Sequence, residues 1–227
     1  LIMSDKRKSL FYPSCGDDLV VPMECFKDEV ECFWFVDIYN WINNPISSPH
    51  GFSALRRVSA RVLQGTTIRD KSEYTVKVTT YTCIRETDGR TLEINICEGR
   101  GYDAFRSIFD DLGEKLAVFF YRGDSPGESG SGFFWLERPR LSNVLNRLIE
   151  DGLIVSDGSN AMSKLSQYHN QRNLEEADLD TLIAKMMPFD FTGWRFTCID
   201  QIGMRYGPTF IWKVSTIPTS TDVTSSD

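Results

Sequence analysis

Two groups of residues near the start of the sequence have the types and spacing that a nucleotide-type ligand site needs. Tyr12, Ser14 and Gly16 follow a short apolar run, and Asp37 ends the next apolar run. A glycine turn after one strand and an acid about 20 residues further on, at the end of the next strand, are suited to hold a ligand's anionic part and its ribose hydroxyls. We therefore expect these four residues to bind a nucleoside-type small molecule.

A third group lies in the segment 122–132, the part of the chain richest in glycine. Backbone amides and small hydroxyl side chains allow close approach of a ligand, and an arginine there can pair with a carboxylate or a phosphate. We expect Arg122, Gly123 and Ser125 to contact the same ligand. The segment lacks the Gly-Lys-Ser/Thr ending of a phosphate-binding P-loop, so the pattern does not favour hydrolysis of a nucleoside triphosphate.

Three carboxylates follow two of the apolar runs and would share one sheet edge if those runs are neighbouring strands. Such a group can act as a general base or hold a divalent cation through oxygen ligands. The predicted catalytic residues are Asp124, Glu128 and Asp157. The six cysteines have no Cys-x-x-Cys spacing and only two histidines accompany them, so we predict no zinc-type metal site and mostly buried, reduced thiols.

The elements that must position these residues alternate between strands and helices. Helical spacing or capping signals mark 19–26, 102–112, 141–149 and 178–187, and unbroken apolar runs mark strands at 9–14, 32–36, 116–121 and 153–156. Alternating residues around Asp88-Gly89 predict a β-hairpin over 74–97, and a second hairpin is expected over 194–214. Residues 53–65 fit either a helix or an extended segment.

This order of elements predicts an α/β fold with a mostly parallel, doubly wound sheet and helices on both faces. The C-terminal antiparallel hairpin and the inserted central β-hairpin would be additions to that sheet. A chain of 227 residues suits one domain, which we place at 1–216, and the Ser/Thr-rich residues 217–227 should form a disordered tail.

Charge and hydropathy exclude some classes of partner. The net charge of −7 does not support a broad nucleic-acid surface. No apolar run approaches the roughly 20 residues needed to span a bilayer, and the N-terminal residues lack the apolar core of a signal peptide. We therefore expect a cytoplasmic protein that has no membrane partner.

The sequence resembles the Rossmann-like (class I) S-adenosylmethionine-dependent methyltransferase superfamily, in which a first strand leads to a glycine turn, a second ends in a ribose-holding acid, and an antiparallel hairpin closes the chain. Residues 12–18, Asp37 and 196–214 match these features in position. The match is that of a divergent member, similar to functionally unassigned bacterial proteins with a Tyr-Pro-x-x-Gly-x-Asp turn and a later Gly-Asp-Ser-Pro-Gly-Glu loop.

The resemblance implies S-adenosylmethionine as cofactor, with the Gly16 turn under its amino-acid portion and Asp37 on its ribose. Two alternatives remain open. One is a non-catalytic binding or scaffold protein that has lost the cofactor. The other is a cation-dependent enzyme that uses Asp124, Glu128 and Asp157.

Overall fold

In the computed structural model, strand β1 (Lys8–Pro13) lies at the centre of four parallel strands. It pairs with β2 (Cys32–Asp37) on one side and with β6 (Lys115–Tyr121) on the other, and β2 pairs with β5 (Thr91–Glu98). Side chains of β1, β2 and β6 are buried almost without interruption, as their apolar runs predict for strands covered on both faces. Because the four strands are parallel, their carboxyl ends lie at one edge.

The structure describes residues 7–39, 46–67, 71–122, 135–136, 140–157, 193–204 and 208–217. The chain divides into two compact units, Leu1–Tyr121 and Arg122–Asp227, and each is described by itself. The first unit contains six strands, of which the parallel ones lie in the order β5-β2-β1-β6. The expectation of one domain over 1–216 stays a prediction, and the expected tail lies outside the described residues except for Ile217.

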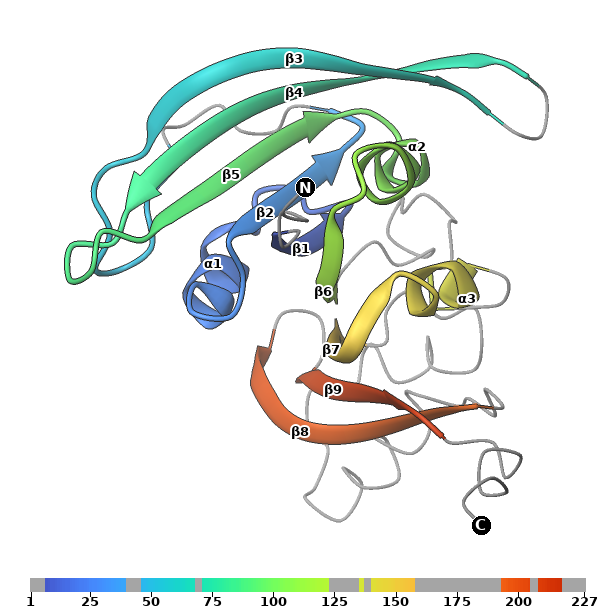
Figure 1. Ribbon diagram of the computed structural model, residues 1–227. Helices are drawn as coiled ribbons and strands as arrows, with labels where there is room; N and C mark the ends of the chain where they lie inside the picture. The colour runs from blue at the N-terminus through green and yellow to red at the C-terminus, as the bar shows by residue number, and fades with distance from the viewer. Residues whose placement is uncertain are drawn as a thin grey trace, which may run out of the picture. The chain divides into compact units, whose positions relative to one another are not determined.

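Two long antiparallel strands extend the parallel group on the β5 side. Strand β3 (Arg56–Thr66) pairs with β4 (Glu73–Ile84), and β4 pairs with β5. Figure 1 shows β3 and β4 as long curved ribbons at one border of the first unit. The hairpin predicted around Asp88-Gly89 is confirmed as β4–β5, and the ambiguous segment 53–65 contributes most of β3.

Helices of the first unit are short, and aromatic rings fix them to the sheet. Phe26 of α1 (Val20–Phe26) meets Phe120 with ring centroids 6.1 Å apart, and Phe105 of α2 meets Phe11 at 5.2 Å. Helix α2 (Gly101–Arg106) continues into a π-helical turn, η1 (Ser107–Asp111). Among the described helices, none is long and apolar enough to cross a membrane.

The second unit contains one described helix and three strands. They are α3 (Arg140–Leu145), β7 (Leu148–Ser156), β8 (Trp194–Met204) and β9 (Pro208–Thr216). Strand β9 is antiparallel to both β7 and β8, so the predicted C-terminal hairpin is present. The helix predicted over 141–149 ends at Leu145, and the one predicted over 178–187 lies outside the described residues.

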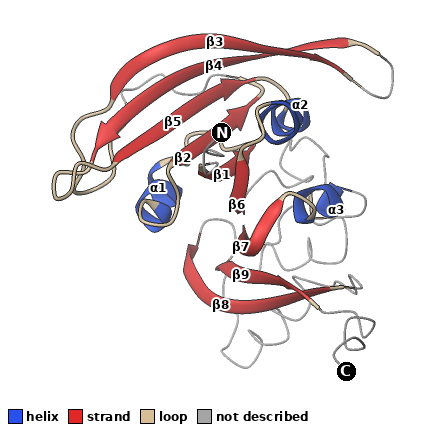
Figure 2. Ribbon diagram, in the orientation of Figure 1, coloured by secondary structure: helices blue, strands red, loops and turns tan. Residues whose placement is uncertain are grey.

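The prediction of a doubly wound α/β fold with helices on both faces is wrong. Among the described residues 54% are strand and 16% are helix, with nine strands in mixed directions and three α-helices (Figure 2). Part of the difference is local. Residues 53–65, which fit either a helix or an extended segment, contribute most of strand β3, and residues 148–149, predicted as the end of a helix, begin strand β7.

The cysteines behave as the sequence predicts. All six are free thiols, and four of them are buried in the first unit: Cys15, Cys32, Cys83 and Cys97. Burial raises the pKa of Cys83 to about 11, and burial raises the pKa values of Cys15 and Cys32 well above the ordinary thiol value. These thiols are therefore packing groups rather than nucleophiles at neutral pH.

A charged network joins strands at the amino edge of the parallel group. Arg7 donates to Glu93 Oε2 at 2.8 Å and to Glu114 Oε1 at 2.7 Å, and Ser9 Oγ donates to Glu114 Oε2 at 2.8 Å. Burial opposes ionisation of Glu93, but hydrogen bonds from Asn95 and Arg7 outweigh it, so the pKa of Glu93 is lowered. The ionised network therefore stabilises the folded state above the ordinary carboxyl pKa, and this contribution is lost as the pH falls through the lowered value.

We expect Arg7→Met to lower the free energy of unfolding by about 1–2 kcal/mol at pH 7, because two partly buried carboxylates lose their cation. The gap from the parent protein should shrink as the pH falls through the lowered pKa of Glu93, because the protonated carboxyl no longer attracts Arg7. Urea unfolding at pH 7.5, 5 and 3.5 measures this difference in stability between Arg7→Met and the parent protein. The control is Lys77→Met, which removes an exposed pair with Glu98 and should change stability by less than about 0.5 kcal/mol. A gap that does not depend on pH would contradict the assignment.

Candidate functional site

The turn after β1 has two residues with left-handed backbone conformation. Ser14 has φ of 53° and Gly16 has φ of 56°, while Cys15 between them is buried. The Cys15 amide donates to Val36 O at 3.2 Å, so the turn is attached to the end of β2. A serine with positive φ is uncommon and carries backbone strain, which is a frequent property of turns at functional sites.

Asp37 connects the ends of three strands. Its Oδ2 accepts a hydrogen bond from the Gly16 amide at 2.9 Å, and its backbone carbonyl accepts one from the Gly99 amide at 2.8 Å. Its Oδ1 also accepts a longer bond from the Tyr39 amide at 3.4 Å. The last residue of β2 and residues that follow β1 and β5 are therefore held in one row at the carboxyl edge, which we call the Asp37 row: Gly16, Asp37 and Gly99.

The predicted cofactor residues of the first unit have different environments. Ser14, Gly16 and Asp37 are half-buried, and the Gly16 amide donates to the Asp37 carboxylate at the turn. Tyr12 is fully buried, with its ring 4.7 Å from that of Phe120 and its hydroxyl donating to Asp18 Oδ2 at 3.0 Å. Its contacts are those of a core residue.

The remaining predicted site residues belong to the second unit. Arg122 and Asp157 are described, and both are buried, with 6% and 8% of their surface exposed. The other four lie outside the described residues: Gly123, Asp124, Ser125 and Glu128. Their cofactor and catalytic roles stay predictions. Within the part of the chain that is described, no group of three His, Cys, Asp or Glu side chains is placed to hold a metal ion.

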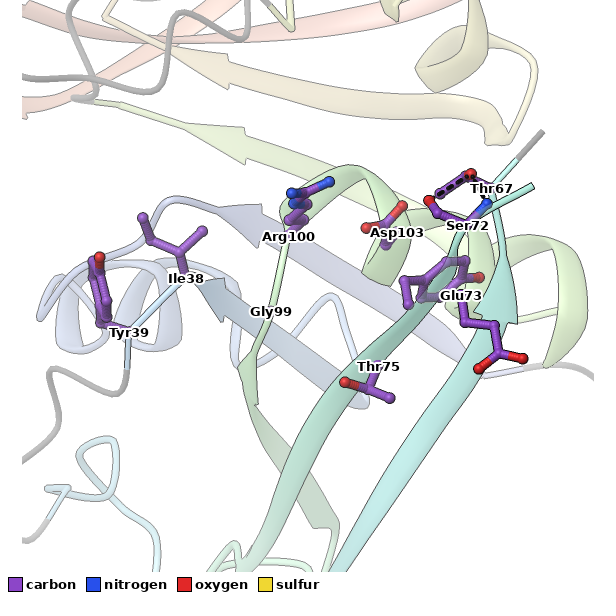
Figure 3. A pocket seen from close by; sticks show the side chains of 10 residues that line it. Ile38, Tyr39, Thr67, Ser72, Glu73, Thr75, Gly99, Arg100 and Asp103 are labelled. Atoms are coloured by element: carbon purple, nitrogen blue, oxygen red, sulfur yellow. Dashed lines mark hydrogen bonds between the residues drawn. The ribbon is translucent and has the colours of Figure 1, made fainter. Parts of the chain in front are cut away.

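A cavity of about 490 Å³ opens beside the Asp37 row, on the side of β5. The residues that leave β2 and β5 line it, together with the ends of β3 and β4: Ile38, Tyr39, Thr67, Ser72, Glu73, Tyr74, Thr75, Gly99, Arg100 and Asp103. Figure 3 shows Ile38 and Tyr39 on one side, Thr67, Ser72 and Glu73 on the other, and Arg100 and Asp103 between them.

The lining combines apolar, aromatic and charged groups. Ile38 and Tyr39 are 56% and 62% exposed, which is unusual for large apolar side chains, and Arg100 is exposed as well. Asp103 is only 7% exposed. Such a cavity can place a planar ring against Tyr39 and Ile38 and can hold an anionic group on Arg100 and a cationic group beside the carboxylates.

Local packing explains the shape of this cavity. A side chain at Gly99 would place its Cβ 2.9 Å from Val76 Cγ2 and 3.2 Å from the Thr75 carbonyl oxygen, so only glycine allows the end of β5 to approach β4 this closely. At the opposite wall, Thr67 and Ser72 close the β3–β4 turn with backbone and hydroxyl hydrogen bonds of 2.8–3.1 Å.

Sequence reasoning missed most of the cavity. The available signal was the Gly99-Arg100-Gly101 segment, which follows an apolar strand as the turn after β1 does. Ile38 and Tyr39 gave no motif, and their position became informative only when β2 and β5 were seen to be neighbours.

No protein-family model matches the sequence, and no curated protein matches it significantly. The functional assignment therefore depends on the residues and geometry described above.

We expect Asp37→Ala to lower the free energy of unfolding by about 1–3 kcal/mol, because the half-buried Gly16 amide loses its acceptor. Asp37→Asn retains an acceptor oxygen and should cost less than half as much. Chemical denaturation of the two variants measures the difference. Equal stability of Asp37→Ala and the parent would show that the Asp37 row does not hold the turn.

We expect Gly16→Ala to lower the free energy of unfolding by about 1–2 kcal/mol, because an L-residue at φ of 56° carries a left-handed penalty. Nothing lies within 4 Å of the added Cβ, so the backbone is the only source of the cost. Ser14→Gly is the matched variant and should be neutral or stabilising, because it removes the same penalty. Thermal and urea unfolding measure the change in stability of both variants. An unchanged free energy of unfolding in Gly16→Ala would contradict the turn geometry.

Proposed function

We propose that the protein binds a nucleoside-type ligand, with S-adenosylmethionine as the first candidate, at the carboxyl edge of β2 and β5. The observation that carries the proposal is the 490 Å³ cavity in which Tyr39, Ile38 and Arg100 meet beside the Asp37 row. Ligands of parallel sheets bind outside the carboxyl ends of the strands.

The chemistry of the lining suits the parts of S-adenosylmethionine. Tyr39 and Ile38 offer a surface for the adenine ring, and the hydroxyls of Thr67, Ser72 and Thr75 suit sugar hydroxyls. Arg100 suits the ligand's carboxylate. The three charged lining residues Glu73, Asp103 and Arg100 give the cavity one net negative charge when ionised, which matches a ligand with one carboxylate, one ammonium and one sulfonium group.

The proposal concerns binding, and the methyl-transfer step stays a prediction from the family resemblance. Asp37 is assigned the role of holding the turn, and its predicted contact with a ribose also stays a prediction. Among the alternatives, the cation-dependent enzyme depends on Asp124 and Glu128, which lie outside the described residues. The scaffold alternative makes the opposite prediction in the binding experiment below.

We expect S-adenosylmethionine to raise the melting temperature and to release or absorb heat on titration, with weaker effects from S-adenosylhomocysteine, which lacks the sulfonium charge. Tyr39→Ala and Arg100→Ala should each weaken binding tenfold or more, since each removes about 1.4 kcal/mol or more of contact free energy. ATP should bind poorly because its phosphates meet Glu73 and Asp103.

Lys77→Ala is the matched control for Arg100→Ala, because Lys77 is an exposed cation of β4 that does not line this cavity. The affinity of Lys77→Ala for S-adenosylmethionine should stay within twofold of that of the parent protein. The absence of any response to millimolar S-adenosylmethionine, S-adenosylhomocysteine and adenosine would overturn the proposal and favour the scaffold alternative.

A further inference from the structure

Strand β3 is the last strand of the first unit on the side away from β6. It extends over eleven residues, Arg56–Thr66, and lies along the outer border of the unit in Figure 1. Within the described part of the chain, β4 is the only strand with which it pairs. Because alternate residues of a strand point their N–H and C=O groups to opposite sides, β3 presents a row of such groups away from β4.

A bulge divides this edge into two parts. The pairing of β3 with β4 shifts between Arg57 and Ser59, and from Ser59 to Thr66 the register is regular. Bulges and charges at an edge discourage indiscriminate pairing. The regular stretch Ser59–Thr66, which we call the β3 edge, is long enough for another strand to pair with it.

The charge of β3 is opposite to that of the whole chain. Its sequence contains Arg56, Arg57 and Arg61 and no acidic residue, whereas the chain has a net charge of −7. The three arginines are exposed, and none lies within ion-pair distance of a described carboxylate. The charge of Arg61 does contribute to the lowered pKa of Glu93. Val58 and Val62 of the same strand are 52% and 53% exposed, so the strand also offers apolar surface.

The register gives the arginines a defined spacing. Arg56 lies opposite Thr82 and Arg61 lies opposite Val78, which are four positions apart on β4 and therefore on the same face. The Arg61 guanidinium lies over the buried Trp34 ring, 5.7 Å from its centroid, which favours an ordered position for that charge. Because Trp34 belongs to β2, this guanidinium reaches over the sheet and away from the outer edge of β3. The arginines left beside a strand added at that edge are Arg56 and Arg57.

A second copy of this chain is a poor occupant of the edge. Pairing β3 with another β3 would bring two strands of three arginines each into one small sheet, without an acidic residue on either strand. Like charges on neighbouring strands are destabilising. Charge complementarity therefore favours a different, acidic strand.

We propose that the β3 edge is a docking site for an extended acidic segment of a partner protein, which adds to the sheet as a strand beside Ser59–Thr66. Main-chain hydrogen bonds to the edge supply affinity. Specificity comes from carboxylates of the partner segment that continues past the bulge to Arg56 and Arg57. This site is separate from the nucleoside-binding proposal, because none of the three arginines lines the cavity.

Fluorescence anisotropy with a labelled dodecapeptide that alternates glutamate and valine, long enough to pair with Ser59–Thr66 and to reach Arg56 and Arg57, tests the proposal. The peptide with lysine in place of glutamate should bind at least tenfold more weakly. Two further glutamate peptides carry N-methyl groups on the odd or on the even residues. Only one of these two should lose at least tenfold in affinity, because alternate residues of an added strand point their amides toward β3.

The variant Arg56→Glu/Arg57→Glu should weaken binding of the glutamate peptide at least tenfold. Arg195→Glu makes the same type of charge change at an exposed residue of β8. This variant should bind the glutamate peptide with an affinity within twofold of that of the parent protein. Both variants change exposed side chains, and circular dichroism checks that they fold.

Three results would overturn the proposal. Equal affinity of both N-methylated peptides and the parent peptide would show attraction by charge without strand addition. A dimer in sedimentation that dissociates in Arg61→Glu would assign the edge to a second copy. Binding of a single-stranded oligonucleotide that depends on the same arginines, without binding of the glutamate peptide, would assign it to nucleic acid.

Discussion

The hydrogen bond from the Gly16 amide to the Asp37 carboxylate is the interaction on which the carboxyl edge of the first unit depends. It holds the turn after β1 against the end of β2, and the Asp37 carbonyl extends the connection to Gly99 after β5. Gly16, the donor of this hydrogen bond, has a left-handed backbone conformation, and Ser14, two residues earlier in the same turn, has one as well. It also fixes the direction in which Ile38 and Tyr39 leave β2, and these two residues form one wall of the cavity.

Charged side chains of the first unit gather in three regions: the amino edge, the carboxyl edge and strand β3. At the amino edge, Arg7 compensates Glu93 and Glu114, so that region is neutralised by its own ion pairs. At the carboxyl edge, the cavity lining includes both signs of charge. Strand β3 has arginines without described ion partners, in a chain that is acidic as a whole.

The β3–β4 hairpin links these two surfaces. Its turn end supplies Thr67 and residues 72–75 to the cavity, and its outer strand forms the basic edge. Close packing holds the hairpin in place: Tyr74 lies across Gly65 of β3, and its hydroxyl hydrogen-bonds to Ser107 Oγ at 2.8 Å. A strand added to β3 would therefore join the same hairpin that lines the cavity beside the Asp37 row.

The sequence by itself determined the elements whose signals are local. Unbroken apolar runs give β1, β2 and β6, the Asp88-Gly89 turn gives the β4–β5 hairpin, and the positions of Gly16 and Asp37 at strand ends follow from their spacing. Tertiary structure decided the rest. Residues 53–65 contain both helix-forming and β-branched residues, so local preference is balanced, and pairing with β4 makes them a strand. The cavity depends on the parallel pairing of β2 with β5, whose residues Tyr39 and Arg100 are far apart in the chain, and no local pattern encodes that contact.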